Sequence, residues 1–507
     1  MNASDELPRS RSFDPRWLPL AVTTVGSFMS ILDTQIINIA LPSILTHFNA
    51  SLSNGQLVIT AYVMALAVVI PLSGFLGERL GMKRLYMFTL ACFVLGSAMC
   101  GLAWGVQSLI FFRILQGLGG GMLQPLGMAI VFTMITPLER PRFIALLGIP
   151  TLLAPLIGPS LGGYIVQYAS WRMIFLINVP IGLIDVLLAY KLLKETPRRS
   201  ELKLDTLGFA FAAIAFPSLL LALSRGSELG WTSPFVLMLF ATGVVALALL
   251  VRRELRHHDP MLRIRLFTIP MFRLSLFIQW LGIFSIFGLN IVIPLYLQRV
   301  HGLTPAGAGL VLLPMGFVAF TTMNLAGRLY NRLGPRPIVI TGLSVLALTT
   351  FGWSRVEADT STLILMVLVC GRGLGMGMFG QILQVVSYNA IPSDQVSRAT
   401  SLVNVCQRIS TAFATAALTT VLIVGLGFTD APEGTSIAAG DAPVDAMVQT
   451  FRYAFYVMTL ISLAGVTLAF FLRDHLLEET MGRSRRTIVP AGAVPATPSL
   501  VSKANEG

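Results

Sequence analysis

The 507-residue sequence has very little charge for its length. Charged residues make up 12% of the chain and hydrophobic residues 55%, and the mean hydropathy is +0.77. An average soluble protein has about 25% charged residues, which it needs to cover its surface. The scarcity of charge therefore excludes a soluble enzyme, a disordered chain and a coiled coil.

Cysteine and histidine are also scarce. The four cysteines lie in long apolar runs without CxxC spacing, and the five histidines are scattered through loops. A disulfide framework or zinc site is not indicated, and a membrane-embedded enzyme would need clustered His, Asp or Glu near one interface. No GxxxxGK[ST] phosphate loop occurs. We therefore expect no metal, no cofactor and no direct use of ATP.

What the sequence does contain is long apolar runs. A helix needs about 20 apolar residues to cross the hydrocarbon core of a bilayer, and the apolar character here is continuous rather than alternating, which favours helices over a β-barrel. We expect fourteen spans, at 17–43, 56–77, 85–104, 107–134, 142–168, 172–194, 206–223, 234–252, 271–298, 306–330, 337–353, 361–390, 398–426 and 450–473.

The Lys and Arg residues are sorted between alternate connections. With the N-terminus inside, 28 of the 36 lie in inside segments, five in outside loops and three within spans. Cytoplasmic loops of membrane proteins carry such an excess. We therefore expect both termini in the cytoplasm, and we attribute the net charge of +12 mostly to membrane orientation rather than to a nucleic-acid partner.

The two ends of the chain are polar. Segment 1–16 has no pattern of a cleavable signal, and the apolar run that follows is too long for a signal peptide, so we expect a retained first span. The tail 476–507 is basic and then rich in Ala, Pro and Ser, which predicts a disordered cytoplasmic segment.

The chain also contains a weak internal repeat. Three segments of the first half align in order with segments of the second half at offsets of 252 to 256 residues, which pairs spans 1–6 with spans 9–14. Parallel six-span repeats are a transporter architecture with its substrate site where the halves meet. The predicted units are 17–200, two inserted helices in 201–265, and 266–475.

Four motifs follow one another on the expected spans. They are Leu32–Pro42 in span 1, Gly74–Arg84 between spans 2 and 3, Arg113 with Gln116–Gly119 in span 4, and Gly158–Gly163 in span 5. Together they resemble the signatures of the major facilitator superfamily and, within it, of the fourteen-span drug:proton antiporters. The resemblance implies an all-α integral membrane protein with two six-helix bundles plus two inserted central helices.

The resemblance also implies a function. It predicts a multi-pass protein of the inner membrane that exports small amphipathic compounds in exchange for protons by alternating access. An exporter dedicated to one endogenous metabolite, such as an antibiotic, lipid or siderophore, is the alternative. The expected partners are a small-molecule substrate, protons and the lipid bilayer; whether an accessory periplasmic adaptor joins them is left open.

Ionisable side chains at membrane depth are costly, which makes them functional candidates. Asp33, Asp185, Arg113, Arg372 and Arg408 lie well inside spans. Asp33 and Arg113 both fall in the outer half of their spans, so they could meet across the cavity wall. Either Asp33 exchanges a proton for substrate and Arg113 tunes it, or the two form a static pair. Asp185 is a second candidate for proton coupling, with a hydrogen bond to a polar neighbour as the alternative.

Polar residues within or near the spans are candidates for lining a substrate cavity, because soft apolar walls with a few polar groups suit amphipathic ligands. Packing is the alternative for each one. The arginines of the second half either attract an anionic group or rest against backbone carbonyls. The candidates are Gln35, Asn38, Gln116, Gln124, Asn290, Arg372, Gln381 and Gln384.

Two motifs are candidates for gating. The turn between spans 2 and 3 carries both signs of charge, so its ion pairs can form and break as the halves move; its candidates are Gly74, Gly77, Glu78, Arg79, Gly81, Lys83 and Arg84. In span 5, proline removes a backbone hydrogen bond and glycine lowers stiffness, and the resemblance implies that the resulting bend prevents leak. Its candidates are Gly158, Pro159, Gly162 and Gly163. In this family Glu78 usually is Asp, and Asp185 usually is apolar.

Overall fold

A computed structural model describes residues 17–50, 52–136, 139–357, 359–392, 395–425 and 444–472. Within these ranges the chain is helical and has no strand. The predicted N-terminal segment 1–16 and the tail 476–507 lie outside the described residues. The helices are α1 (Trp17–Phe48), α2 (Leu52–Leu80), α3 (Met82–Gly101), α4 (Val106–Phe132), α5 (Arg140–Leu147), α6 (Ile149–Tyr168), α7 (Met173–Leu176), α8 (Asn178–Leu192), α9 (Thr206–Leu229), α10 (Pro234–Arg256), the 3₁₀ helix η1 (Ile264–Thr268), α11 (Pro270–Arg299), α12 (Pro305–Leu333), α13 (Pro335–Trp353), α14 (Thr362–Asn389), α15 (Val396–Gly425) and α16 (Val444–Ala469).

Each of the fourteen expected spans falls on one helix or on two consecutive helices. Span 5 is divided into α5 and α6 at Gly148, and span 6 into α7 and α8 at Ile177. Twelve segments of the described chain are by themselves long and apolar enough to cross a membrane, and α6 and α15 are not among them. The buried residues of α15 include polar ones, among them Ser397, Ser401 and Asn404.

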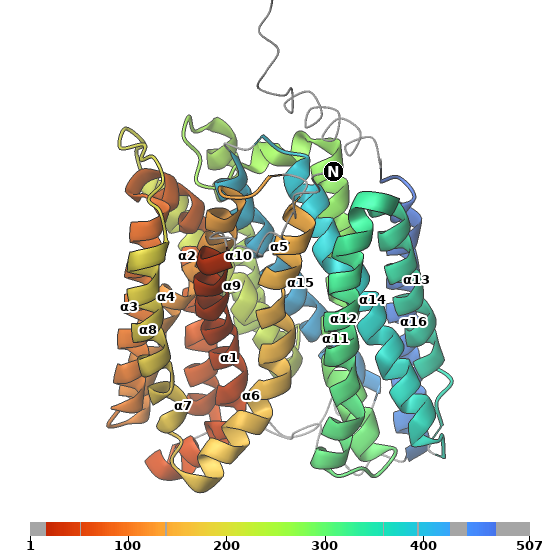
Figure 1. Ribbon diagram of the computed structural model, residues 1–507. Helices are drawn as coiled ribbons and strands as arrows, with labels where there is room; N and C mark the ends of the chain where they lie inside the picture. Colours follow the sequence, from red (N-terminus) through yellow and green to blue (C-terminus); the bar gives the residue numbers. More distant parts are fainter. Residues whose placement is uncertain are drawn as a thin grey trace, which may run out of the picture.

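The helices form two bundles related by the repeat (Figure 1). In the first bundle, α4 packs against α1, α2 and α3; in the second, α14 packs in the same way against α11, α12 and α13. The first bundle comprises α1 to α8 and the second α11 to α16. The predicted fold of two six-span bundles with two inserted helices is confirmed.

The inserted helices α9 and α10 pack against each other, and α9 also contacts α2 of the first bundle and α15 of the second. Asp205 caps α9 by accepting a hydrogen bond from the Gly208 N–H at 3.0 Å. The same carboxylate accepts Arg253 Nε of α10 at 3.1 and 3.0 Å, which ties the two inserted helices together. Because α9 contacts both bundles, the two inserted helices lie beside the contact between the bundles.

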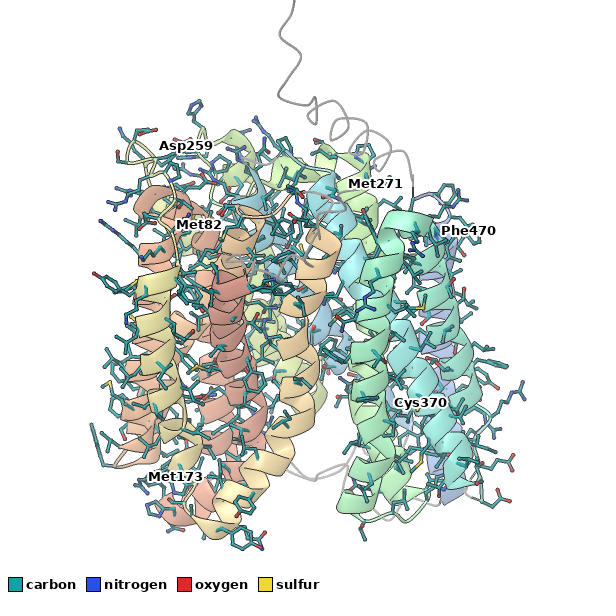
Figure 2. The ribbon with its side chains drawn as sticks, in the orientation of Figure 1. Met82, Met173, Asp259, Met271, Cys370 and Phe470 are labelled. Atoms are coloured by element: carbon teal, nitrogen blue, oxygen red, sulfur yellow. The ribbon has the colours of Figure 1, made fainter. Side chains whose placement is uncertain are left out.

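The connections alternate between the two ends of the molecule as the sequence predicts. Met82, Asp259, Met271 and Phe470 lie at one end, and Met173 lies at the other (Figure 2). We call the first the basic end, because the connections that meet there carry most of the Lys and Arg residues of the loops.

The bundles pack against each other at the basic end. An apolar cluster there includes Phe132 and Phe143 of the first bundle and Tyr388 and Ile391 of the second. The rings of Phe132 and Tyr388 are 4.7 Å apart between centroids, and Arg140 donates to Asn389 Oδ1 at 2.6 Å. Of the other three clusters of the described chain, two stay within one bundle, and one joins the first bundle to Met261 of the inserted segment. The molecule is therefore closed at its basic end.

Candidate proton-coupling and gating sites

Asp33 of α1 and Arg113 of α4 form an ion pair inside the first bundle, as the sequence predicts. The Arg113 Nη1 group donates to Asp33 Oδ2, and neither side chain has any exposed surface. Burying two charges is costly, and removing one partner leaves the other uncompensated. The pair is therefore stable only while both of its members remain charged. If one member loses its charge, the surroundings of the other must rearrange.

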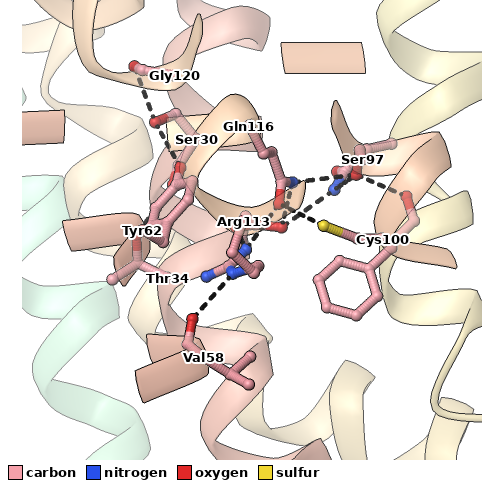
Figure 3. Close-up of polar contacts among 12 residues, drawn as sticks. Ser30, Thr34, Val58, Tyr62, Ser97, Cys100, Arg113, Gln116 and Gly120 are labelled. Atoms are coloured by element: carbon pink, nitrogen blue, oxygen red, sulfur yellow. Dashed lines mark hydrogen bonds and ion pairs between the residues drawn. The ribbon is translucent and has the colours of Figure 1, made fainter. Parts of the chain in front are cut away.

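Neutral polar groups complete the surroundings of the pair (Figure 3). Gln116 Nε2 donates to Asp33 Oδ1 at 2.9 Å and to Ser97 Oγ at 3.1 Å. Asn178 Nδ2 donates to Asp33 Oδ1 at 3.4 Å and also to Ser97 Oγ at 3.1 Å. Asp33 thereby links α1 to α4 and α8 directly, and to α3 through Ser97.

Arg113 is held from α2 as well. Its Nε donates to the Val58 carbonyl at 3.3 Å, and its guanidinium carbon lies 4.0 Å from the centre of the Tyr62 ring. Tyr62 in turn donates its hydroxyl to the Ser30 carbonyl at 3.2 Å. A cation over an aromatic face is favourable, more so where water is excluded. A change in the charge of Asp33 would therefore reach five helices of the first bundle.

Asp185 of α8 lies elsewhere in the same bundle. Its Oδ2 accepts a hydrogen bond from the Tyr86 hydroxyl at 3.4 Å, and Tyr86 also contacts the Val22 carbonyl at 3.1 Å. Gly26 makes room for this contact, because a Cβ there would lie 2.2 Å from the Tyr86 oxygen. The polar neighbour expected as the alternative is thus present, and a role in proton coupling stays a prediction.

The candidates for a substrate cavity do not form one cluster. Gln116 belongs to the Asp33 network, and Gln35 lies beside Gly158 of α6, whose Cβ would be 2.9 Å from Gln35 Cβ. Asn38 and Asn290 are exposed, and Gln124 is half-buried. These five residues lie on α1, α4 and α11.

Three further candidates are on α14. Arg372 is buried and its Nη2 donates to the Ile286 carbonyl, while its Nη1 has no hydrogen-bond partner among the described residues. Gln381 reaches toward the first bundle, since a Cβ on Gly148 would lie 2.4 Å from Gln381 Nε2. Gln384 is buried, and its Oε1 has no partner in the described chain. The α14 candidates therefore retain unused hydrogen-bonding atoms.

The predicted gating turn lies at the contact between the bundles. A Cβ on Gly74 would lie 2.6 Å from the Ser397 carbonyl oxygen and 2.8 Å from Arg398 Cα, so only glycine allows this approach of α2 and α15. The Gly74 N–H donates to Ser401 Oγ at 2.9 Å, and Ser397 Oγ donates to the Gly74 carbonyl at 3.2 Å.

Glu78 adds an ion pair across the same contact. Its Oε2 accepts Arg398 Nη2 at 2.8 Å and Arg398 Nε at 3.1 Å, and both side chains are buried. Arg398 Nη1 donates to the Pro260 carbonyl at 2.7 Å, in the connection that follows α10. This pair therefore joins both bundles and the inserted segment.

The rest of the turn contacts the first bundle. Gly77 packs near Leu126, and Gly81 has a φ of +92°, with the Glu195 carboxylate where a Cβ would be. Lys83 Nζ donates to the Tyr190 carbonyl at 2.6 Å. Arg79 is half-buried, and Arg84 lies 3.5 Å from Glu195.

The glycines of span 5 lie against α1. A Cβ on Gly162 would be 2.7 Å from Ile36 Cγ1, and Gly163 lies at ordinary contact distance from Ile39. With Gly158 beside Gln35, these residues bring α6 close to the segment that holds Asp33. The side chain of Pro159 lies outside the described side chains.

Sequence reasoning did not identify every residue of these sites. Arg398 counted only as an orientation charge, since nothing in the sequence points to a partner 320 positions away. Asn178 had a signal, because it opens an Asn-Val-Pro-Ile-Gly segment that belongs to the resemblance. Glu254 lay outside the expected span 8, yet α10 continues past it and buries it, with its Oε2 accepting the Leu262 N–H at 3.1 Å.

Two repeated bundles of membrane-crossing helices, packed together at one end, define the class of multi-pass transporters built from parallel repeats. The chain belongs to the Major Facilitator Superfamily, whose family profile matches residues 23–415.

Several proteins resemble it along most of their length. The multidrug export protein EmrB of Escherichia coli K12 is 31% identical over 406 residues, which is 78% of each chain. The uncharacterized MFS-type transporter YhcA of Bacillus subtilis 168 is 34% identical over 79% of this chain and 76% of its own. The lincomycin resistance protein LmrB of Listeria monocytogenes is 27% identical over 90% of this chain and 96% of its own.

Solved structures share the fold. A crystal structure of the human organic anion transporter MFSD10 superposes with a TM-score of 0.63 at 15% identity, covering 89% of this chain and all of that one. The proton:xylose symporter XylE superposes with a TM-score of 0.61 at 14% identity, covering 92% of this chain and 98% of its own.

Proposed function

We propose that this protein exports small amphipathic compounds in exchange for protons by alternating access. The observation that carries the proposal is the buried Asp33–Arg113 pair with its neutral donors Gln116 and Asn178. An acid held at membrane depth is costly and needs a compensating role. The multidrug and lincomycin resistance relatives named above support the choice of substrate class.

The position of Asp33 would couple its protonation to the conformation of the first bundle. Protonation removes the negative charge that faces Arg113 and turns one acceptor oxygen into a donor. The contacts of α1 with α4 and α8, and with α3 through Ser97, must then rearrange.

The gating turn and span 5 would control access to the substrate from the two sides of the membrane. We assign the basic end to the cytoplasmic side of the inner membrane and both termini to the cytoplasm. The chain then divides into a first bundle at 17–200, the inserted helices at 201–265 and a second bundle at 266–475. The Glu78–Arg398 pair and the Gly74 contact then close the cytoplasmic side in this conformation. Opening that side requires breaking both.

A proton gradient is a sufficient energy source. One charge moving across 100 mV is worth about 2.3 kcal/mol. At about 150 mV this supports roughly 300-fold accumulation per charge.

Export of one endogenous metabolite is the second candidate. An anionic metabolite would find a partner in Arg372, which is buried without an acidic partner among the described residues and has an Nη1 without a hydrogen bond there. Such a group suits an anionic substrate better than a dication.

The proposal is tested by proton release from proteoliposomes that contain the purified protein. The vesicles are challenged with a matched panel of amphipathic cations, neutral compounds and anions, with empty vesicles as the control. We expect release with several structurally unrelated compounds. Release with none of the panel, together with transport of a single metabolite, would replace the first proposal by the second.

A further inference from the structure

A groove of about 340 Å³ opens at the basic end of the first bundle. Its wall combines three arginines with apolar side chains and has no acidic residue. The lining residues are Arg79, Leu80, Arg84, Leu85, Phe88, Arg198 and Ser200. This combination suits a ligand with an anionic head and an apolar tail.

The arginines of the groove have unused donors. Neither the Arg79 nor the Arg198 side chain has a hydrogen bond or ion pair among the described residues. The Arg84 side chain is 66% exposed, and its Nε lies 3.5 Å from Glu195 Oε2. The other oxygen of Glu195 accepts the Lys83 and Thr196 N–H groups at 3.2 and 3.1 Å. The groove therefore has positive charge that the chain itself does not neutralise.

An apolar stripe continues from the groove along α3. Phe88, Leu95 and Leu102 are 66%, 63% and 71% exposed. Phe88 and Leu95 are seven residues apart, about two helical turns, so they lie on one face of α3, and Leu102 follows directly after the last residue of the helix. Helices α3 and α8 form the outer edge of the first bundle (Figure 1). The stripe therefore faces the hydrocarbon of the bilayer.

We propose that the groove binds an anionic phospholipid. The phosphate lies among Arg79, Arg84 and Arg198, and an acyl chain follows Phe88 toward Leu102. The guanidinium fork matches phosphate oxygens in geometry and charge. A basic residue near an anionic membrane surface contributes about 1 kcal/mol. The apolar stripe favours a lipid over a free phosphate ion, because a phosphate ion has no apolar part to pack against the stripe.

This site shares no residue with the proposed proton-coupling site, but it shares Arg79 and Arg84 with the gating turn. Arg79 follows Glu78, whose carboxylate pairs with Arg398 of the second bundle. A lipid headgroup that holds Arg79 and Arg84 stabilises the turn in the arrangement that closes the basic end.

The test is lipid retention by the full chain, measured by native mass spectrometry after purification with equimolar phosphatidylglycerol and phosphatidylcholine of the same acyl length. The variants are Arg198→Gln, Arg84→Gln with Arg198→Gln, and Phe88→Ser. The matched control is Arg332→Gln, which removes an exposed arginine from the equivalent turn of the second bundle at the same end. Glycerol 3-phosphate serves as the soluble competitor.

We expect wild type and Arg332→Gln to retain phosphatidylglycerol in preference to phosphatidylcholine. Arg198→Gln should lower that preference about fivefold, because each arginine contributes about 1 kcal/mol. The double variant should lower the preference further. Phe88→Ser should weaken the retention of phosphatidylglycerol. Equal retention by wild type and the double variant overturns the proposal, as does an equal loss in Arg332→Gln. Full displacement by glycerol 3-phosphate overturns the lipid assignment in favour of a phosphate site.

Discussion

Glu78 and Arg398 form a buried ion pair although 320 positions separate them in the chain. One carboxylate oxygen of Glu78 accepts two guanidinium nitrogens, at 2.8 and 3.1 Å, and the third nitrogen of Arg398 bonds to the Pro260 carbonyl at 2.7 Å. The first bundle, the second bundle and the inserted segment therefore meet at a single side chain.

Arg398→Met should open the basic end. The substitution leaves the Glu78 carboxylate buried without its cation, and breaking a buried pair in this way costs about 3–5 kcal/mol. Spin labels at Leu80 and Leu333, exposed and equivalent in the two repeats, would report the opening in a background without the native cysteines. We expect longer distances in the variant and partial recovery when Glu78→Gln is added. An unchanged distance distribution would show that the pair does not hold the bundles together.

Gly74→Ala should disfavour the same closed arrangement by a different route. Its Cβ would lie 2.6 Å from the Ser397 carbonyl oxygen, in backbone that has no flexible end to move aside. Overpacking of this kind typically costs about 1–3 kcal/mol. Thermal unfolding in detergent measures the effect, with Gly309→Ala as the control because nothing lies within 4 Å of a Cβ there. Equal melting temperatures of the two variants would contradict the prediction.

The fold was predictable because membrane helices are specified locally. Each span needs its own apolar length, and the charge of each loop sets its side, so fourteen spans and their alternation could be read directly. The divisions at Gly148 and Ile177 were not predicted, because the sequence stays apolar through both. The first has a local signal all the same, since Pro150 stands in the first turn of α6, a position where proline commonly begins a helix.

The sites were predictable only in part. Asp33 and Arg113 stand out because charge is rare at membrane depth, and their pairing followed from similar depth. Ser97 and Tyr62 carry no such signal, since neutral polar residues occur in every span. Arg398 was not predicted for another reason. It stands in a basic loop, where membrane orientation alone accounts for its charge, and its partner belongs to the other bundle.

The link between the inserted helices should depend on pH through Asp205. Burial raises the pKa of this carboxyl, but hydrogen bonds from Arg253 and the Gly208 N–H, with nearby positive charge, lower it more, so that its pKa lies below the usual value. A carboxyl with a lowered pKa stabilises the fold above its unfolded pKa of about 3.9, and this stability is lost as the pH falls through the folded pKa.

Asp205→Asn isolates this charge, because Asn remains a good helix cap. We expect the variant to melt below wild type at pH 7, and the gap to narrow as the pH falls below about 4. Melting curves of the detergent-solubilised protein between pH 7 and pH 3.5 measure it. A gap that stays constant over that range would show that the charge of Asp205 contributes nothing to stability.

Proton release by Asp33→Asn tests the central claim most directly. The purified variant is reconstituted beside wild type and Asp259→Asn, a control that neutralises an acid in the connection after α10, and insertion is checked by size-exclusion chromatography and vesicle flotation. On addition of a transported compound, wild type and Asp259→Asn should release protons, and Asp33→Asn should release none while it still inserts and folds. Full proton-coupled export by Asp33→Asn would contradict the account and leave Asp33 and Arg113 as a structural pair.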